Sequence, residues 1–257
     1  MDDITCKWDR LSLNQRESEI VPLTSDVTGD GKVLVAKFFT KQHINMEAFF
    51  RTLKSMWRTE KSFDIRDLGS NLAMILFDDE YDLGHILMRG PWSYNKYLLG
   101  LYKPRKNESI KHARFDRESF WVQIHDLPIQ HMSKTNAEAI GSFLGLVEQV
   151  DASPTGDYRG HCLRVQINID ISQPLCRGRM VDIGELSPLW VSFQYKQMPI
   201  FCYWCGLLNH DEKDCKLWIC SKGTLRKDEQ QYGAWLRASS ERNQKSHAQS
   251  APSSTPT

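Results

Sequence analysis

The chain has 257 residues, of which 40% are hydrophobic and 25% charged, with 33 Lys and Arg against 32 Asp and Glu. This balance is typical of globular proteins, allows one large domain or two small ones, and indicates no partner through net charge. No apolar run approaches the ~20 residues of a transmembrane helix, so we expect no membrane partner. The N-terminal residues 1–4 lack the basic and apolar segments of a signal peptide.

Charge and cysteine are distributed unevenly along the chain. Residues 1–31 carry a net charge of −4, and residues 103–114 carry one of +4. Three of the seven cysteines fall in one short cluster, which suits metal binding in a reducing compartment better than a disulfide framework. We therefore expect the protein in the nucleus or cytoplasm. We interpret residues 1–31 as a flexible acidic lead-in, with turn signals at Asp26 and at residues 29–31.

Residues 32–115 alternate between strand and helix signals. Short apolar runs rich in β-forming residues predict strands, and apolar residues at helical spacing after Asn45 and Asp79 predict two capped helices. The expected elements are a strand at 33–39, a helix at 46–57, strands at 63–67 and 72–77, a helix that Gly90-Pro91 ends, and a strand at 96–102. This β-α-β-β-α-β order is that of ferredoxin-like and RNA-recognition domains. The basic residues 103–114 are expected to form a linker within this unit.

A second, β-rich unit is predicted over residues 116–198. Between residues 163 and 171, apolar residues alternate with polar ones, which predicts a strand with one buried and one solvated face. Further strands are expected at 120–124, 147–151, 179–183 and 190–195, with a turn at 154–156 and a helix that Ser133 caps and Gly145 stops. The strands would form an antiparallel sheet, and no internal repeat of fixed length is evident. The predicted fold class is α+β: a ferredoxin-like unit, a β-rich unit, a small zinc knuckle and a disordered C-terminal tail.

Four residues within the segment 199–220 have the spacing of a zinc site. Cys202, Cys205, His210 and Cys215 supply three thiolates and one imidazole, which can form a tetrahedral shell around Zn²⁺. A segment this short cannot build a hydrophobic core, so we expect the metal to fold it. Because four protein ligands leave no position for an activated water, we expect a structural zinc ion and no enzymatic activity.

The residues around the four ligands indicate nucleic-acid binding. Tyr203 and Trp204 lie between the first two ligands, and a module this small is expected to leave at least one of the rings free to stack on an unpaired base. Lys213, Lys216 and Lys222 are placed to contact the phosphate backbone.

The segment from Cys202 to Cys215, CYWCGLLNHDEKDC, resembles the CCHC zinc knuckle of retroviral and retrotransposon gag-type proteins. Segments upstream are similar to those of a large plant family that pairs a domain of unknown function with this knuckle: 89–92, 120–128, 163–165 with Asp170, and 199–202. Members of that family resemble the gag-like first open reading frame of plant non-LTR retrotransposons. The resemblance covers about residues 30–220. It implies zinc on the four knuckle ligands and nucleic-acid binding as the activity.

Further knuckle residues bear on this interpretation. Gly206 follows the second cysteine, where a tight turn must bring backbone amides towards sulfur. Asn209 stands where the family commonly has glycine, and asparagine tolerates the left-handed region better than most residues. Asp211, Glu212 and Asp214 lie inside the knuckle, where they would weaken its grip on phosphate. These acids favour an alternative in which zinc only stabilises a protein–protein module.

Other polar clusters have simpler interpretations. The run at residues 78–80 could suggest a metal-dependent nuclease, but three consecutive carboxylates do not converge on one ion, and a helix-capping turn is the better interpretation. Arg164, Gln166 and Asn168 could contact RNA, although a solvated sheet face is the more frequent explanation. The basic stretch 103–114 could bind phosphates, and a solvated linker explains it about as well.

The first domain lacks the usual base-stacking face of RNA-recognition domains, because strand 72–77 offers only Phe77, at its end. We therefore interpret the chain as a non-enzymatic protein that uses zinc and binds single-stranded RNA or DNA through its knuckle. The α+β unit would position the knuckle or mediate self-association. The alternative is a zinc-stabilised interaction or assembly module without significant nucleic-acid affinity, and no small-molecule substrate is expected. Residues 221–257 are predicted to be polar and largely disordered.

Overall fold

The computed structural model describes residues 12, 14–22, 32–106, 108–151, 161–184 and 187–239. The chain divides into two units, Met1–Asp30 and Gly31–Thr257. In the first unit, residues 14–22 contain one turn, in which the Asn14 side chain accepts hydrogen bonds from the amides of Arg16 and Glu17. The turns expected at Asp26, at 29–31 and at 154–156 lie outside the described residues.

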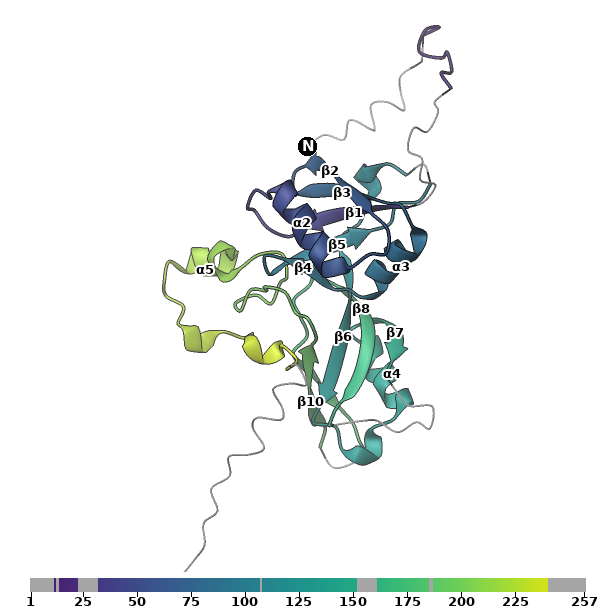
Figure 1. The fold of residues 1–257 in the computed structure, drawn as a ribbon. Coiled ribbons are helices and arrows are strands. Elements are labelled where there is room, and N and C mark those ends of the chain that lie inside the picture. Colours follow the sequence, from purple (N-terminus) through teal and green to yellow (C-terminus); the bar gives the residue numbers. More distant parts are fainter. Residues whose placement is uncertain are drawn as a thin grey trace, which may run out of the picture. The chain divides into compact units, whose positions relative to one another are not determined.

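The second unit begins with the predicted ferredoxin-like domain. Its elements are β1 (Val33–Phe38), α2 (Met46–Trp57), β2 (Phe63–Gly69), β3 (Leu72–Phe77), α3 (Glu80–Met88), β4 (Trp92–Tyr94) and β5 (Tyr97–Tyr102). Asn45 and Asp79 cap the two helices through their side-chain oxygens, as predicted. The antiparallel sheet has the order β2-β3-β1-β5-β4, and α2 and α3 pack against one face of it (Figure 1).

Strand β4 was not predicted. It pairs with β5 across a two-residue turn in which Asn95 and Lys96 have φ values of 50° and 69°. Positive φ at both turn residues gives the twist that suits a tight hairpin. With three residues, β4 is too short to show the alternation that identifies a strand in a sequence.

The β-rich unit is also confirmed. Its elements are β6 (Arg117–His125), α4 (Lys134–Ser142), β7 (Gly145–Val150), β8 (Leu163–Asp170), β9 (Gly178–Val181) and β10 (Leu189–Tyr195). Ser133 caps α4, and its side chain accepts from the amide of Asn136. The antiparallel sheet has the order β7-β8-β6-β10-β9. The expected fold class, α+β with two antiparallel sheets, is therefore the one observed.

The second sheet repeats the topology of the first. If the five strands of each sheet are numbered in chain order, both sheets have the order second, third, first, fifth, fourth. In each sheet, a helix follows the first strand. The ferredoxin-like domain and the β-rich unit differ after their third strand. The ferredoxin-like domain has α3 there, whereas the corresponding residues 171–177 of the β-rich unit form no helix. No repeat was evident in the sequence because the two units share strand pairing and not side chains.

Residues from outside the second sheet fill the place of the missing helix. Its core contains α4 side chains together with Leu175, Met198, Phe201, Leu208 and Leu236. The segment that carries the zinc-ligand pattern thus contributes to the core of the β-rich unit. The expectation that this segment stands apart as a self-contained knuckle is corrected, because it covers part of a sheet.

The described part of the predicted tail, residues 221–239, contains ordered elements. Residues 227–229 and 234–236 form the short 3-10 helices η4 (Lys227–Glu229) and η5 (Ala234–Leu236), and Leu236 is fully buried. Arg237 then forms a parallel bridge with Tyr195 at the end of β10. Leu236, the half-buried Tyr232 and the backbone contacts of Tyr232 and Ala238 together hold this stretch against the rest of the domain. Residues 240–257 lie outside the described residues.

Neither membrane helices nor disulfide bonds contribute to the part of the fold that the structure describes. The longest helix, α2, has 12 residues, and no described helix combines the length and apolarity needed to cross a membrane. The six described cysteines are all free.

Asp82 of α3 provides a test of how the first domain is held together. It is buried, and its carboxylate accepts hydrogen bonds from the backbone amides of Glu60 and Lys61 at 3.0 and 2.9 Å. Asp82→Ala would leave both amides without their partner, so we expect the free energy of unfolding to fall by about 2 kcal/mol in denaturant titrations. Asp64→Ala, at an exposed position on β2, should change it by less than about 0.5 kcal/mol. Equal losses in the two variants would contradict this role of Asp82.

Candidate metal centre

The four predicted ligands converge on one point. One sulfur or ring-nitrogen atom from each of Cys202, Cys205, His210 and Cys215 lies within 4.8 Å of the others. Cys205 Sγ and His210 Nε2 are 3.3 Å apart. In a tetrahedral zinc shell, neighbouring sulfur and nitrogen ligands lie roughly 3.5–3.8 Å apart. The three thiols and the imidazole therefore fit a metal ion, and this donor set suggests zinc.

A tight backbone turn holds the first two ligands. The Gly206 amide donates to the Cys202 carbonyl, and the Cys202 amide donates to the Leu207 carbonyl, both at 2.9 Å. Gly206 has a φ of 75°, and a Cβ at this position would lie 2.5 Å from the Tyr232 ring. Glycine is required twice, by the left-handed conformation and by the contact with Tyr232.

Asn209 supports the histidine ligand. It was expected to adopt a left-handed conformation, but it is not among the described residues with positive φ. Its side-chain oxygen instead lies 2.6 Å from His210 Nδ1. With Nε2 facing Cys205, the Nδ1–H group donates to Asn209, and such a partner fixes the ring orientation and the tautomer of a metal-binding histidine.

Burial and backbone amides shape the protonation of the ligands. Burial raises the pKa of Cys202 to about 12 and also raises the pKa of Cys205. Burial acts in the same direction on Cys215, but hydrogen bonds from the Trp218 and Leu217 amides in α5 (Lys216–Ser221) and from the Cys202 and Cys205 thiols outweigh it and lower the pKa of that thiol. Burial lowers the pKa of His210, which favours the neutral imidazole that a metal requires. Metal binding to these thiols must release protons, so affinity falls as the pH is lowered.

The aromatic residues of the knuckle are not arranged as expected. Trp204 is only 8% exposed, and its ring stacks on Trp218 with centroids 5.2 Å apart and an interplanar angle of 14°. Tyr203 is half-buried, with its ring 5.0 Å from that of Phe201. Trp204 is therefore corrected from a base-stacking residue to a packing residue. The half-buried Trp218 was missed, although an aromatic residue three positions after the last ligand was a visible signal.

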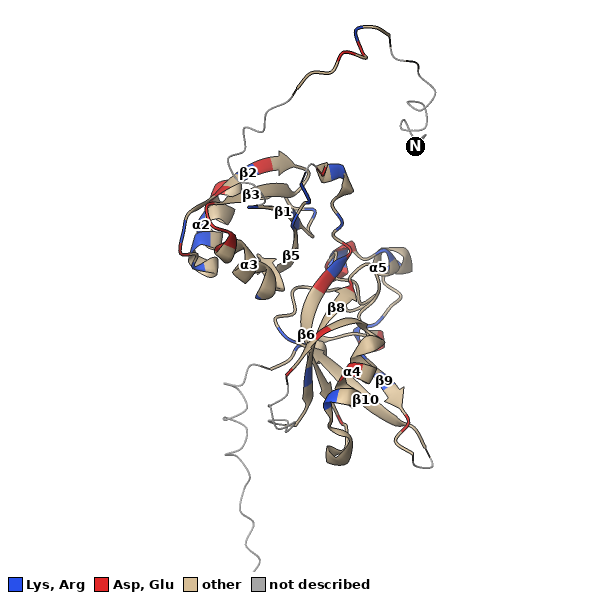
Figure 2. Cartoon of the chain, turned by 90° about the vertical axis from the view of Figure 1, so that its right-hand side faces the viewer, with Lys and Arg blue, Asp and Glu red and all other residues tan. Residues whose placement is uncertain are grey.

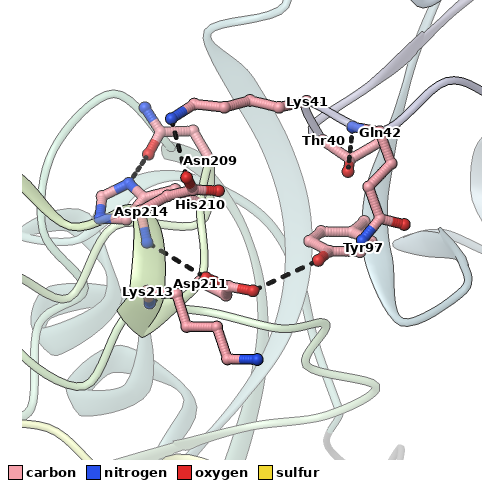
Figure 3. A network of polar contacts seen from close by, with 9 residues as sticks. All are labelled: Thr40, Lys41, Gln42, Tyr97, Asn209, His210, Asp211, Lys213 and Asp214. Carbon is pink, nitrogen blue, oxygen red and sulfur yellow. Dashed lines mark hydrogen bonds and ion pairs between the residues drawn. The ribbon is translucent and has the colours of Figure 1, made fainter.

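Each of the three acids inside the knuckle has a partner within the protein. The pairs are Asp211 with Tyr97, Glu212 with Gln230 and Asp214 with Lys41, at 3.4, 3.1 and 3.0 Å. Figure 3 shows the contacts of Asp211 and Asp214 with the first domain. Burial and then the Asp211 carboxylate raise the pKa of Tyr97, so its hydroxyl stays a donor. Each acid is therefore engaged by a partner, and the ion pair with Lys41 offsets the charge of Asp214, which reduces the repulsion of phosphate expected from the sequence.

The three lysines expected to contact nucleic acid are exposed. Lys213 lies in η3 (Glu212–Asp214), Lys216 begins α5, and Lys222 ends it. None of the three forms an ion pair with another described residue. They leave the knuckle with positive charge on its outside.

Several contacts fix the knuckle to the rest of the second unit. The Leu175 amide donates to the Gly206 carbonyl at 3.0 Å, and the Ile200 amide donates to the Lys96 carbonyl at 2.6 Å. The Arg237 guanidinium donates to the carbonyls of Met198 and Pro199 and lies over the Phe201 ring. The β4–β5 turn, the second sheet and the segment after the knuckle all contribute to its position.

Replacing one ligand should separate zinc binding from general thiol chemistry. We expect Cys215→Ser to lose tight zinc binding and to lower the thermal midpoint, because Phe201 and Leu208 belong to the same segment as the ligands. Native mass spectrometry and thermal unfolding measure the two effects. Cys220→Ser is the matched control, since Cys220 is exposed and outside the ligand set. Equal zinc loss in the control would contradict the assignment.

Asn209 allows a test of how the histidine is supported. Asn209→Ala removes the acceptor of His210 Nδ1–H, so we expect zinc affinity to fall about tenfold or more in competition with a chelating dye. Asn209→Asp keeps an acceptor oxygen and should retain affinity. Loss of affinity in both variants would show that the backbone, and not the hydrogen bond, is what matters at this position.

Comparisons with known proteins agree with the geometry. Residues 31–105 match a family described as a domain of unknown function, DUF4283, and residues 169–217 match a family described as a zinc knuckle. No curated protein shows significant similarity to the chain. Among solved structures, the C. elegans NONO-1 homodimer is similar at 9% identity, covering 91% of this chain and 79% of that chain, but its TM-score of 0.25 supports no conclusion. The chain thus carries a DUF4283 segment followed by a CCHC-type zinc knuckle, an order that fits a gag-like arrangement.

Proposed function

We propose that this is a non-enzymatic, zinc-dependent protein that binds single-stranded RNA or DNA through its knuckle. We also propose that it derives from the gag-like part of a plant retrotransposon and acts in the nucleus or cytoplasm. The observation that carries the proposal is the Cys₃His cluster with three exposed lysines around it. A closed set of four protein ligands supports a structural metal rather than a catalytic one.

The proposed contact between the knuckle and nucleic acid has two parts, an electrostatic one and a stacking one. Lys213, Lys216 and Lys222 would meet the phosphate backbone, while an unpaired base would stack on a half-buried ring, Tyr203 or Trp218. Trp204 would support Trp218 from its buried side. Bound zinc would supply a structural centre that keeps these groups together.

The acidic run at residues 78–80 supports the non-enzymatic interpretation. Asp79 caps α3, Asp78 accepts a hydrogen bond from the Ser62 hydroxyl, and Glu80 pairs with Lys103 at 3.1 Å. The three carboxylates have three different partners, so this run does not resemble a site for a catalytic ion.

A protein-interaction role is the second candidate, and an apolar groove favours it. The groove has a volume of about 430 Å³, lies between α4 and β9, and is lined in part by Leu127, Ile140, Phe143 and Met180. Phe143 is 64% exposed and Met180 52%. Exposed apolar side chains gathered at one groove are typical of protein contacts. Self-association through this groove would be compatible with nucleic-acid binding at the knuckle.

Salt dependence tests the proposed function. The zinc-loaded full chain is titrated into a fluorescein-labelled 12-nucleotide single-stranded RNA, and into DNA of the same sequence, and anisotropy is measured between 50 and 200 mM salt. We expect binding that weakens with salt. The Lys216→Ala and Lys222→Ala double variant should reduce the slope of log K against log salt by about 1.4, because each phosphate contact on a single strand contributes about 0.7.

Lys61→Ala is the control for this experiment, because Lys61 is exposed and lies before β2. It should leave the slope unchanged. A protein that retains zinc and shows no salt-sensitive binding to either probe would contradict the proposal and support the protein-interaction role.

A further inference from the structure

The two faces of the second sheet differ in what they carry. Side chains from β6, β8 and β10 on one face form the core with α4 and the knuckle segment. The side chains between them point to the opposite face, and all of them are partly exposed. They include Ser119, Trp121 and Gln123 of β6, Arg164, Gln166 and Asn168 of β8, and Trp190, Ser192 and Gln194 of β10. We call this the open face of the second sheet.

Trp121 lies in the middle of the open face with amide side chains around it. It is the direct cross-strand partner of Gln166, which in turn pairs with Gln149 of β7. On the other side, Gln123 pairs with Gln194 of β10. Directly paired residues share a face, with Cβ atoms about 4.5–5.5 Å apart. One indole ring is thus framed by amides from four strands.

A groove of about 950 Å³ runs over this part of the open face. Its lining includes Trp121, Gln123, Gln149, Arg164 and Lys196. Asp151 also lines it, 3.7 Å from the Arg164 guanidinium, so the charged residues of the groove sum to one positive charge. The middle of β6, β8 and β10 carries no charged residue, as Figure 2 shows.

These groups limit the chemistry of a ligand. An apolar partner would bury the amides without hydrogen bonds, which is costly. Gln149 and Gln166 each offer a donor and an acceptor, while Gln123 has its side-chain oxygen 3.1 Å from His125 Nε2 and offers its NH₂ group. The indole of Trp121 offers a flat surface for stacking, and Arg164 and Lys196 can meet phosphates. Single-stranded nucleic acid presents base edges, flat rings and phosphates, which are the groups that these side chains can bind.

We propose that the open face is a second binding site for single-stranded nucleic acid, with one base stacked on Trp121. Gln123, Gln149 and Gln166 hydrogen-bond to base edges, and Arg164 and Lys196 contact phosphates. This site rests on the proposed function, since both involve single-stranded nucleic acid, and it lies on the face of the sheet opposite the one that the knuckle segment covers.

The composition of the open face does not follow from the topology that the two sheets share, because the corresponding face of the first sheet carries different side chains. On β1 and β3 the corresponding face carries the aliphatic residues Val33, Val35, Met74 and Leu76 together with Lys37. The aromatic residue of this face is Tyr102 of β5, the partner of Val35, whose hydroxyl donates to Glu108 and whose ring lies near that of Phe115. Phe77, which the sequence offered as its only aromatic, lies in the core and is 5% exposed. An indole ring surrounded by amide side chains is therefore found on the described strands of the second sheet and not on those of the first.

The test uses the zinc-loaded full chain and a fluorescein-labelled 12-nucleotide single-stranded RNA of mixed sequence. We expect Trp121→Ala to weaken binding about fivefold or more, the effect of losing one stacked base. Tyr81→Ala removes an exposed aromatic residue on α3 of the first domain, outside both proposed sites, and should leave affinity unchanged. Thermal unfolding shows whether each variant is folded.

A second variant keeps the proposal testable if Trp121→Ala does not fold. Gln166→Glu changes little in shape but places a carboxylate beside Trp121, so it should weaken binding by a similar factor. Gln130→Glu, at an exposed position in η2 (Ile129–His131), is its control. Photo-crosslinking of the same RNA with 4-thiouridine should label peptides of β6 or β8.

The outcomes separate this site from the knuckle. If wild-type protein binds no RNA, both proposals fail. If the Lys216→Ala and Lys222→Ala variant binds weakly while Trp121→Ala and Gln166→Glu bind like wild type, the knuckle proposal stands and the open-face site is overturned. If only the open-face variants lose affinity, the site is supported and the knuckle is not the contact.

Discussion

The packing of the knuckle segment onto the second sheet is the constraint on which the rest of the structure depends. That sheet has one helix, α4, where the first sheet has two, and Phe201, Leu208 and Leu236 fill the remaining core. Phe201 directly precedes the first ligand, and Leu208 lies between the second and third. Metal binding and the folding of the β-rich unit are therefore coupled, because ordering the ligands also orders the core residues among them.

The same packing decides which side of the knuckle faces outward. Asp211 and Asp214 contact Tyr97 and Lys41 of the first domain, while the lysines around the ligands remain exposed. The Lys41–Asp214 pair is solvent-exposed and contributes little energy by itself. The pair instead affects the orientation of the knuckle. Two acids of the knuckle contact the first domain, while its lysines are exposed to solvent.

The two sheets share one topology but differ in the side chains on the face that points away from the core. In the first sheet that face carries mainly aliphatic residues and Lys37 on β1 and β3, while Tyr102 of β5 lies near Phe115, which follows the basic linker. In the second sheet, Trp121 and neighbouring amides occupy the face. Strand pairing uses only backbone atoms, so the outward side chains were free to diverge without altering the fold.

The sequence by itself determined the features that depend on nearby residues. Helix caps act within three residues, strands show local alternation, and the four ligands lie within 14 residues, so the elements and the metal site could be predicted. Only the tertiary structure decided three features: the burial of Trp204, the packing of the knuckle segment where the second sheet lacks a helix, and the partners of the knuckle's acids. Tyr97 and Asp211 are 114 residues apart, and Lys41 and Asp214 are 173 apart. Contacts at such separations leave no periodic signal, because they depend on how complete sheets pack and not on the spacing of residues along one element.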